Sequence, residues 1–235
     1  MISEKFWQMY GGAEWDYILD GPLSGKANME RDLELLAGCG KPTLRLYSWL
    51  RPTLSLGRNQ KDGWVDYRLC ESLNVEVTRR PTGGRALLHM PDEITYAVIL
   101  PDFGALSVSE AFASLASMLA LCLKMLGLPV GVAESGHIPG GASHPSCLAV
   151  TAPGEVTAYG RKLVGSAQVR REGRLLQHGS LVRRYNEELL QKVIPGAQAE
   201  MDLNTLGFAD LQAEDIAAEW RQAAVGAPEL WLKYM

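Results

Sequence analysis

The segment from residue 94 to residue 110 constrains the fold more than any other part of the chain. From Ile94 to Leu100 large apolar residues occupy every second position, which is the spacing of a β-strand, and a proline ends the run. Ser107 and Glu110 then form the S-x-x-E pattern of a capping box, which predicts a helix that runs to Gly127. The uncharged part of this helix, residues 111–123, is too short to span a bilayer, so we expect a buried helix and no membrane association.

The remaining elements follow from local patterns along the chain. Further strands are predicted at 44–49, 53–56, 74–79 and 129–132, and a three-strand meander at 155–159, 162–171 and 174–181. Further helices are predicted from Asn28 as N-cap to Gly38, and near 186–194 and 212–224, and the glycine-rich segment 134–144 is predicted to be a mobile surface loop. Because strands and helices do not alternate regularly, the expected class is α+β: a mixed β-sheet with packed helices.

Length and composition favour one domain. With 235 residues and 47% hydrophobic content, the chain can bury a substantial single core. We therefore expect a single domain over 1–235, with a core at about 15–195 and a C-terminal helical appendage at 196–235.

The charge of the chain is uneven. The net charge of −4 argues against a nucleic-acid binder that relies on global charge. The range 161–184, however, contains seven basic residues and one acidic residue, whereas 196–235 contains seven acidic and two basic residues. The basic stretch is either a solvated face or a docking surface for an acidic partner protein.

The cysteines and histidines exclude two classes of site. The four cysteines are widely spaced without a C-x-x-C pair, which indicates neither a disulfide scaffold nor a zinc site and favours a reducing cytoplasm. No two histidines have a metal-ligand spacing, so no metal is predicted. His89 and His178 are each more typical of hydrogen-bonded core groups than of a catalytic base or a metal ligand.

Gly83 and Gly84 lie between two strand-like runs. A Gly-Gly pair is sufficient for a simple hairpin turn. Glycines also let a ligand approach the backbone, and the neighbouring Arg79, Arg80 and Arg85 add donors that a turn does not need. We therefore predict a ligand-binding loop.

Cys147 and Lys162 suggest covalent acyl chemistry. An ammonium near a thiol favours the thiolate, which is the nucleophilic form. Cys147 follows a loop in which its side chain could be exposed, although a lone cysteine is more often part of the packing. Lys162 is either a solvated strand lysine or a half-buried ammonium beside the thiol.

Three blocks of sequence resemble a known family. They are RRPTGGRALLH at 79–89, GRKLVGSAQ at 160–168 and LQHGS at 176–180, and together they resemble the signature blocks of the lipoate–protein ligase and octanoyltransferase family. The resemblance covers most of residues 15–195 and implies the biotin/lipoate protein ligase catalytic fold. Pro145-Ser146-Cys147, placed before Lys162, is similar to the cysteine-bearing loop of the Gram-positive-type octanoyltransferases.

This resemblance implies an activity. Octanoate would pass from octanoyl-acyl carrier protein to Cys147 as a thioester, and then to a lysine of a lipoyl domain or of the glycine-cleavage H protein, with no cofactor. Lys162 would lower the pKa of the thiol. The implied substrate-binding residues are Arg80, Thr82, Gly83, Gly84, Arg85, Ala86, Leu87, His89, Gly165, Ser166 and Ala167. The alternatives are an ATP-dependent lipoate–protein ligase, an octanoyl amidotransferase between lipoyl carriers, and a non-catalytic carrier-binding module.

Overall fold

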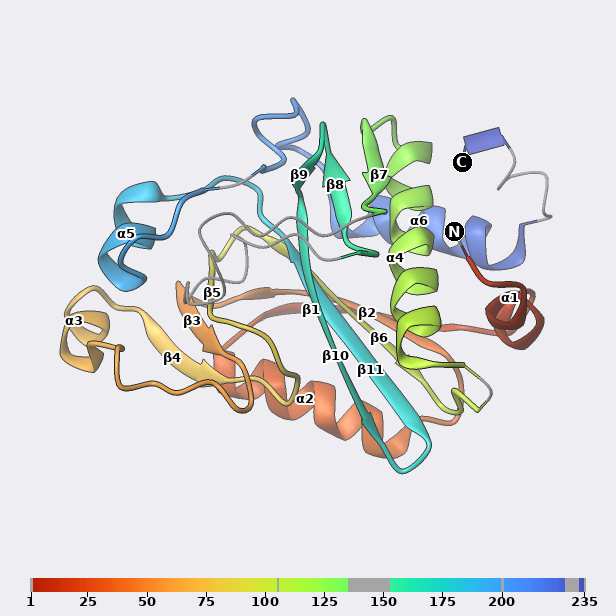
Figure 1. The fold of residues 1–235 in the computed structure, drawn as a ribbon, viewed down its shortest axis with the longest axis horizontal. Coiled ribbons are helices and arrows are strands. Elements are labelled where there is room, and N and C mark those ends of the chain that lie inside the picture. Colours follow the sequence, from red (N-terminus) through yellow and green to blue (C-terminus); the bar gives the residue numbers. More distant parts are fainter. Residues whose placement is uncertain (1, 105, 135–152, 200, 227–232, 235) are drawn as a thin grey trace.

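The computed structural model describes residues 2–104, 106–134, 153–199, 201–226 and 233–234 (Figure 1). Its centre is a five-stranded sheet in the order β1-β2-β6-β11-β10. These strands are β1 (Asp16–Leu23), β2 (Thr43–Trp49), β6 (Ile94–Leu100), β11 (Arg174–Leu181) and β10 (Val164–Arg171). The sheet is mixed because β1 runs parallel to β2 while the other neighbours pair antiparallel.

Two three-stranded sheets flank the central sheet. One has the order β4-β3-β5, and the other has the order β7-β8-β9. Their strands are β3 (Thr53–Leu56), β4 (Glu76–Arg79), β5 (Leu87–His89), β7 (Val130–Val132), β8 (Val156–Ala158) and β9 (Arg161–Lys162). The predicted meander is therefore wrong as a single unit: β8 and β9 form a hairpin in the small sheet, whereas β10 and β11 pair in the central one.

The helices are α1 (Glu4–Tyr10), α2 (Gly25–Gly38), α3 (Tyr67–Ser72), α4 (Val108–Met125), α5 (Glu187–Val193) and α6 (Ala213–Val225). The capping box predicted for α4 is confirmed, since Ser107 and Glu110 exchange both hydrogen bonds. The predicted start of α2 is wrong. Ser24 is its N-cap, and Asn28 lies inside the helix, where its buried amide donates to the carbonyl of Ser48.

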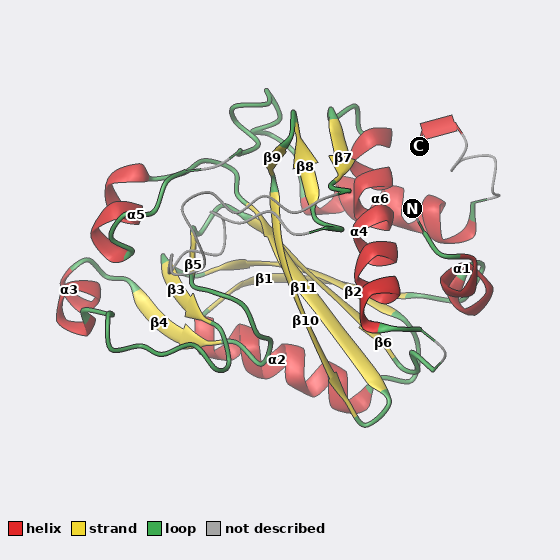
Figure 2. Ribbon diagram, viewed as in Figure 1, coloured by secondary structure: helices red, strands yellow, loops and turns green. Residues whose placement is uncertain are grey.

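Helices cover both faces of the central sheet (Figure 2). Helices α4 and α6 pack on the face that presents Tyr96 and Val98, and α2 packs on the face that presents Ala97 and Ile99. Because Trp220 of α6 is buried in the largest core cluster, α6 is part of the core and not a separate appendage.

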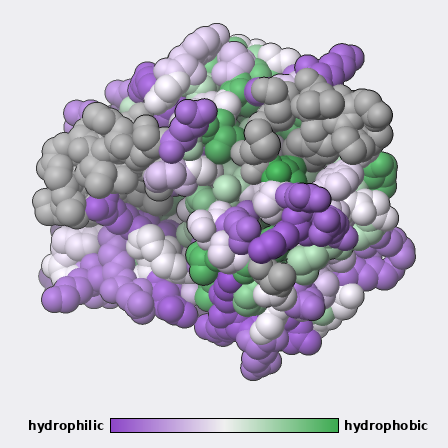
Figure 3. All heavy atoms as spheres, turned by 45° about the vertical axis from the view of Figure 1, so that its right-hand side comes forward, coloured by the Kyte–Doolittle hydropathy of each residue, from purple (hydrophilic) through white to green (hydrophobic). Residues whose placement is uncertain are grey.

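Helix α4 is the most apolar helix among the described residues. By length and composition alone it could cross a membrane, yet every residue from Leu115 to Leu123 is buried in the fold. It is thus the buried core helix predicted from the sequence. In the view of Figure 3 hydrophilic residues cover most of the coloured surface, and hydrophobic residues show in smaller areas between them.

Candidate functional site

A pocket lies on the α2 side of the central sheet. It contains about 350 Å³ of space between atoms, part of it open to solvent. Its wall is formed by Met29, Tyr47, Trp49, Arg80, Leu87, His89, Thr95, Gly165, Ala167, His178, Gly179 and Ser180. Five predicted binding residues are therefore in the wall, namely Arg80, Leu87, His89, Gly165 and Ala167.

The register of the central sheet explains which side chains face the pocket. Ala167 pairs with His178, and Ser180 pairs with Thr95 across the next ladder. Residues directly opposite each other on neighbouring strands point to the same face. Ser166 is one residue out of this phase, so it faces the other side, where its hydroxyl lies 2.8 Å from the Tyr96 hydroxyl. The structure therefore does not place Ser166 in the pocket wall.

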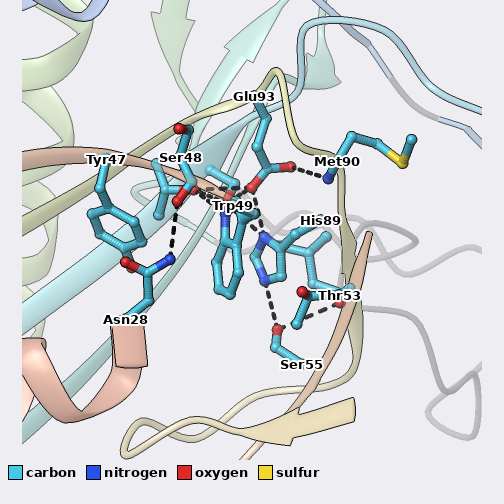
Figure 4. A network of polar contacts seen from close by, with 12 residues as sticks. Asn28, Tyr47, Ser48, Trp49, Thr53, Ser55, His89, Met90 and Glu93 are labelled. Carbon is cyan, nitrogen blue, oxygen red and sulfur yellow. Dashed lines mark hydrogen bonds and ion pairs between the residues drawn. The ribbon is translucent and has the colours of Figure 1, made fainter. Parts of the chain in front are cut away.

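His89 is held in a buried polar network (Figure 4). Its Nε2 lies 2.6 Å from Oγ of Ser55, and its Nδ1 lies 2.6 Å from Oε1 of Glu93. The ring stacks on Trp49 with 3.9 Å between centroids. Burial lowers the pKa of His89, and the neighbouring charge of Glu93 only partly opposes this effect. The interpretation of His89 as a hydrogen-bonded core group is thus confirmed, and one edge of it borders the pocket.

His178 has the same type of environment. Its Nε2 lies 2.7 Å from Oγ1 of Thr82, and its Nδ1 lies 2.8 Å from Oδ2 of Asp32. Asp32 also forms a fully buried ion pair with Arg45, with 2.7 Å between Oδ1 and Nη1. The predicted binding residue Thr82 is therefore tied to the pocket through His178, although its own side chain is not in the wall.

The segment 80–85 is fixed largely by hydrogen bonds to its own backbone. Arg80 donates from Nη2 to the carbonyls of Gly83 and Arg85 and from Nη1 to the carbonyl of Ser55. Its guanidinium thus braces the loop as well as bordering the pocket. Gly84 has φ +95°, a conformation that glycine adopts at little cost.

The other predicted residues of this block are placed differently. Gly83 and Gly84 are exposed, and Ala86 is buried in the cluster under β3 and β5, so none of these three is in the pocket wall. Arg79 does not face the pocket either, because it donates to the carbonyls of Gly57 and Gln60. The donors that we interpreted as ligand groups therefore act largely on the protein itself.

Lys162 is buried, and so the expectation of a solvated or half-buried lysine is wrong. Its Nζ donates to Oε1 of Glu155 at 2.6 Å, and both side chains are almost fully buried. Burial raises the pKa of Tyr96, and the charge of Glu155 adds to this effect, so the pair lies within electrostatic reach of that phenol. Cys147 and the predicted loop 134–144, apart from its first residue, lie outside the described residues. The distance between the two proposed catalytic groups therefore stays a prediction.

The sequence did not single out several residues of this site. Glu93 is four residues after His89, and that H-x-x-x-E spacing is the one local signal that could have identified it. Asp32 and Met29 lie in a predicted helix and Tyr47 and Trp49 in a predicted strand, and nothing in those local patterns marks them as site residues. Within the part of the chain that the structure describes, no group of three or more His, Cys, Asp or Glu residues could hold a metal ion.

A mixed sheet with helices on both faces and a largely apolar pocket against one of them defines an α+β domain with a candidate small-molecule site. The chain belongs to the family of lipoyl protein ligase A/B catalytic domains, whose family model matches residues 24–220. This confirms both the family resemblance and the fold class predicted from the sequence.

Relatives and solved structures agree with this assignment. The chain is 42% identical to a protein of Carboxydothermus hydrogenoformans named octanoyltransferase LipM. The match extends over 191 residues, which are 77% of this chain and 69% of that protein. It is 33% identical to the Clostridioides difficile protein of the same name, over 88% of this chain and 79% of that one. A T. acidophilum structure titled as a lipoate protein ligase with bound lipoic acid has TM-score 0.73 at 19% identity, over 93% of this chain and 86% of that chain.

Proposed function

We propose that this protein is an octanoyltransferase of lipoate biosynthesis, which transfers an octanoyl group to a lysine of a lipoyl carrier protein. The observation that carries the proposal is the similarity to proteins named octanoyltransferase LipM, at 33–42% identity over more than three quarters of the chain in the two examples above. The pocket supports it, because eight of its wall residues come from the three signature blocks.

The proposed reaction has two acyl transfers. The thiolate of Cys147 attacks the carbonyl carbon of octanoyl-acyl carrier protein, and the carrier thiolate leaves and takes up a proton. The ε-amine of the acceptor lysine then attacks the Cys147 thioester, loses a proton and forms an amide, and the cysteine thiol is restored. Both steps start from a thioester, so neither needs ATP. A thiol nucleophile also fits the reducing cytoplasm that we propose as the location of the protein.

Lys162 supplies the positive charge in this scheme. We propose that its ammonium lowers the pKa of the Cys147 thiol and helps to hold the acyl carbonyl oxygen. The ion pair with Glu155 supports a fixed position for the ammonium, because two buried charges at 2.6 Å hold each other in place. The same pair offsets part of the charge, so Lys162 acts at close range and not through a long-range field.

The carrier proteins are the proposed partners. Octanoyl-acyl carrier protein is the donor, and a lipoyl domain or the glycine-cleavage H protein is the acceptor. One T. acidophilum structure with TM-score 0.70 is titled as a bipartite lipoate protein ligase with its E2 lipoyl domain, which supports a lipoyl domain as acceptor. The basic stretch at 161–184 contributes less to docking than its number of basic residues suggests, because of those seven residues only Arg161, Arg171 and Arg184 are exposed.

Intact-mass spectrometry tests the reaction directly. Wild type incubated with octanoyl-acyl carrier protein should gain one octanoyl group, and a lipoyl domain added afterwards should remove it. Cys147→Ala should show neither step. A fully active Cys147→Ala protein would refute the covalent mechanism. Activity only with ATP and free lipoate identifies a ligase, activity only with an octanoylated lipoyl carrier identifies an amidotransferase, and no transfer in any arm identifies a carrier-binding module.

A second variant tests the lysine. Lys162→Ala should lower kcat/KM by roughly two orders of magnitude or more, as expected when one preorganised electrostatic stabiliser is removed. The matched control is Lys192→Ala, because Lys192 forms an ion pair with Glu188 at the same 2.6 Å but at the surface. Near-normal rates for a folded Lys162→Ala protein would restrict this lysine to a structural role.

A further inference from the structure

Glu93 begins a chain of hydrogen bonds that ends at the 80–85 segment. Its Oε1 lies 2.6 Å from Nδ1 of His89, and Nε2 of the same ring lies 2.6 Å from Oγ of Ser55. Nη1 of Arg80 donates to this Oγ at 2.8 Å. All four side chains are buried, so water does not compete for these bonds.

The carboxylate at one end of this chain determines where the imidazole proton lies. A carboxylate oxygen only accepts hydrogen bonds, so Nδ1 of His89 carries the proton and Nε2 of the neutral ring is an acceptor. The hydroxyl of Ser55 then donates to Nε2, and its oxygen accepts from Arg80. The lowered pKa of His89, caused by burial, agrees with a neutral ring.

Two further hydroxyl groups of the pocket wall also bind to Glu93. Thr95 Oγ1 donates to Oε1 at 2.9 Å, and Ser180 Oγ donates to the same oxygen at 2.7 Å. The backbone N–H of Met90 donates to Oε2 at 3.2 Å. Glu93 is not in the pocket wall, yet it sets the direction of the protons on three groups that are: His89, Thr95 and Ser180.

We propose that Glu93 is a positioning residue for the acyl pocket, because it fixes the proton of His89 and turns two wall hydroxyls away from the acyl chain. The proposal rests on the proposed function only for its kinetic arm. An apolar chain that enters this pocket then meets ring faces and carbon atoms, and the donors beside it are already paired. The same arrangement recurs at Asp32, His178 and Thr82, so each imidazole in the wall is oriented by its own acid.

Nuclear magnetic resonance of the ¹⁵N-labelled histidines tests the orientation in the whole chain. Wild type, measured above the ordinary histidine pKa, should show His89 as the Nδ1–H tautomer, with His89→Gln used to assign the signal. Glu93→Leu removes both carboxylate oxygens and leaves Nδ1 of His89 the more distant Ser180 Oγ, at 3.1 Å, so His89 should shift away from that tautomer, while His178 keeps its own. An Nε2–H tautomer or an imidazolium at His89 in wild type would overturn the proposal, as would an unchanged tautomer in folded Glu93→Leu.

Kinetics with the acyl donor test the consequence. In Glu93→Leu three donors lose their carboxylate acceptor and keep the longer contacts with one another, at 3.1 Å, so KM for octanoyl-acyl carrier protein should rise roughly tenfold, with kcat changed by less than about threefold. Glu93→Gln keeps one oxygen for these donors and should recover most of the affinity. Asp92→Leu, at the exposed neighbouring position, is the matched control.

The arms separate the possible failures. Equal KM values in wild type and Glu93→Leu, or equal losses in kcat and kcat/KM, would overturn the positioning role. If Glu93→Leu does not fold, the wild-type tautomer and Glu93→Gln decide the question. If wild type transfers no octanoyl group, the proposed function fails while the tautomer measurement still tests the role of Glu93.

Discussion

At the scale of single residues, the site is built from buried polar groups that are paired with each other. His89 lies between Ser55 and Glu93, His178 lies between Thr82 and Asp32, and Lys162 lies on Glu155. A buried polar group without a partner costs about 1–3 kcal/mol, so each of these residues depends on its partner as much as on its own position. Substitutions at the partners should therefore affect the pocket as strongly as substitutions in its wall.

The titration of His89 predicts a pH dependence of stability. Its pKa is lowered below 6.5 in the folded protein by burial, with Arg80 and His178 adding to the shift and Glu93 opposing it. Between the lowered value and 6.5 the unfolded chain binds more protons, so the free energy of unfolding falls as the pH drops below 6.5. The loss amounts to at most about 1.4 kcal/mol per pH unit.

Urea unfolding of wild type and His89→Gln over a series of pH values measures this loss. The variant should show a shallower decline below 6.5, because it lacks the group that takes up the proton. The same slope in both proteins would assign the pH dependence to other groups.

Residue-level chemistry was only partly predictable from the sequence. Of the binding residues implied by the signature blocks, Arg80, Leu87, His89, Gly165 and Ala167 line one pocket, and their role in binding stays a prediction. Asp32 was missed because its contact with His178 joins segments 146 positions apart. Glu93 lies four positions from His89, but its contact with Ser180 spans 87 positions. No periodicity or local spacing contains such a pairing.

At the scale of elements, the 80–85 segment is held by close backbone contact with the turn after β3. A Cβ on Gly57 would lie 1.9 Å from the carbonyl oxygen of Gly84, which no real contact allows. The amide of Arg58 also donates to the carbonyl of Thr82 at 2.8 Å. The 80–85 segment therefore takes its position from this turn as well as from Arg80.

Gly57→Ala should displace the 80–85 segment. We expect a loss of stability of about 1–3 kcal/mol, as for other overpacked sites, together with a higher KM for the acyl donor. Gly63→Ala is the matched control, since a Cβ there has no heavy atom within 4 Å. Chemical denaturation and steady-state kinetics of both variants check the prediction. Similar stabilities and KM values for the two variants would mean that the turn at Gly57 can shift to accommodate the added methyl group.

Elements with strong local signals were predicted well and those without them were not. The alternation of apolar residues at 94–100 predicted β6, and the capping box at Ser107 predicted the start of α4. Strand β1 was missed because Gly21 and Pro22 interrupt its pattern, and its pairing shifts register between Leu19 and Pro22. The break between β9 and β10 was missed because residues 162–171 have the local pattern of one strand, although their partners lie in two sheets.

At the scale of the whole molecule, the largest core joins segments from both ends of the chain. Trp220 of α6 packs at 5.7 Å between ring centroids on Trp15, which precedes β1, and both are buried with α4. The interpretation of 196–235 as an appendage failed here because a short amphipathic helix has the same local pattern whether it packs on the core or beside it.

Trp220→Ala should destabilise the entire domain. Removing a fully buried tryptophan costs about 3–5 kcal/mol, which is a large part of the stability of a typical domain. Gln222→Ala, at an exposed position of the same helix, should stay within about 0.5 kcal/mol of wild type. Differential scanning calorimetry should show a single transition that moves down for Trp220→Ala. A lowered transition for α6 alone, separate from the rest, would contradict a shared core.

The packing of α6 on α4 has a consequence for synthesis of the chain on the ribosome. Helix α4 is complete at Met125, but α6, which contacts it, begins only at Ala213. A nascent chain must therefore carry an apolar helix that still lacks its α6 partner while nearly ninety further residues are translated, and this interval is when a chaperone has most to bind.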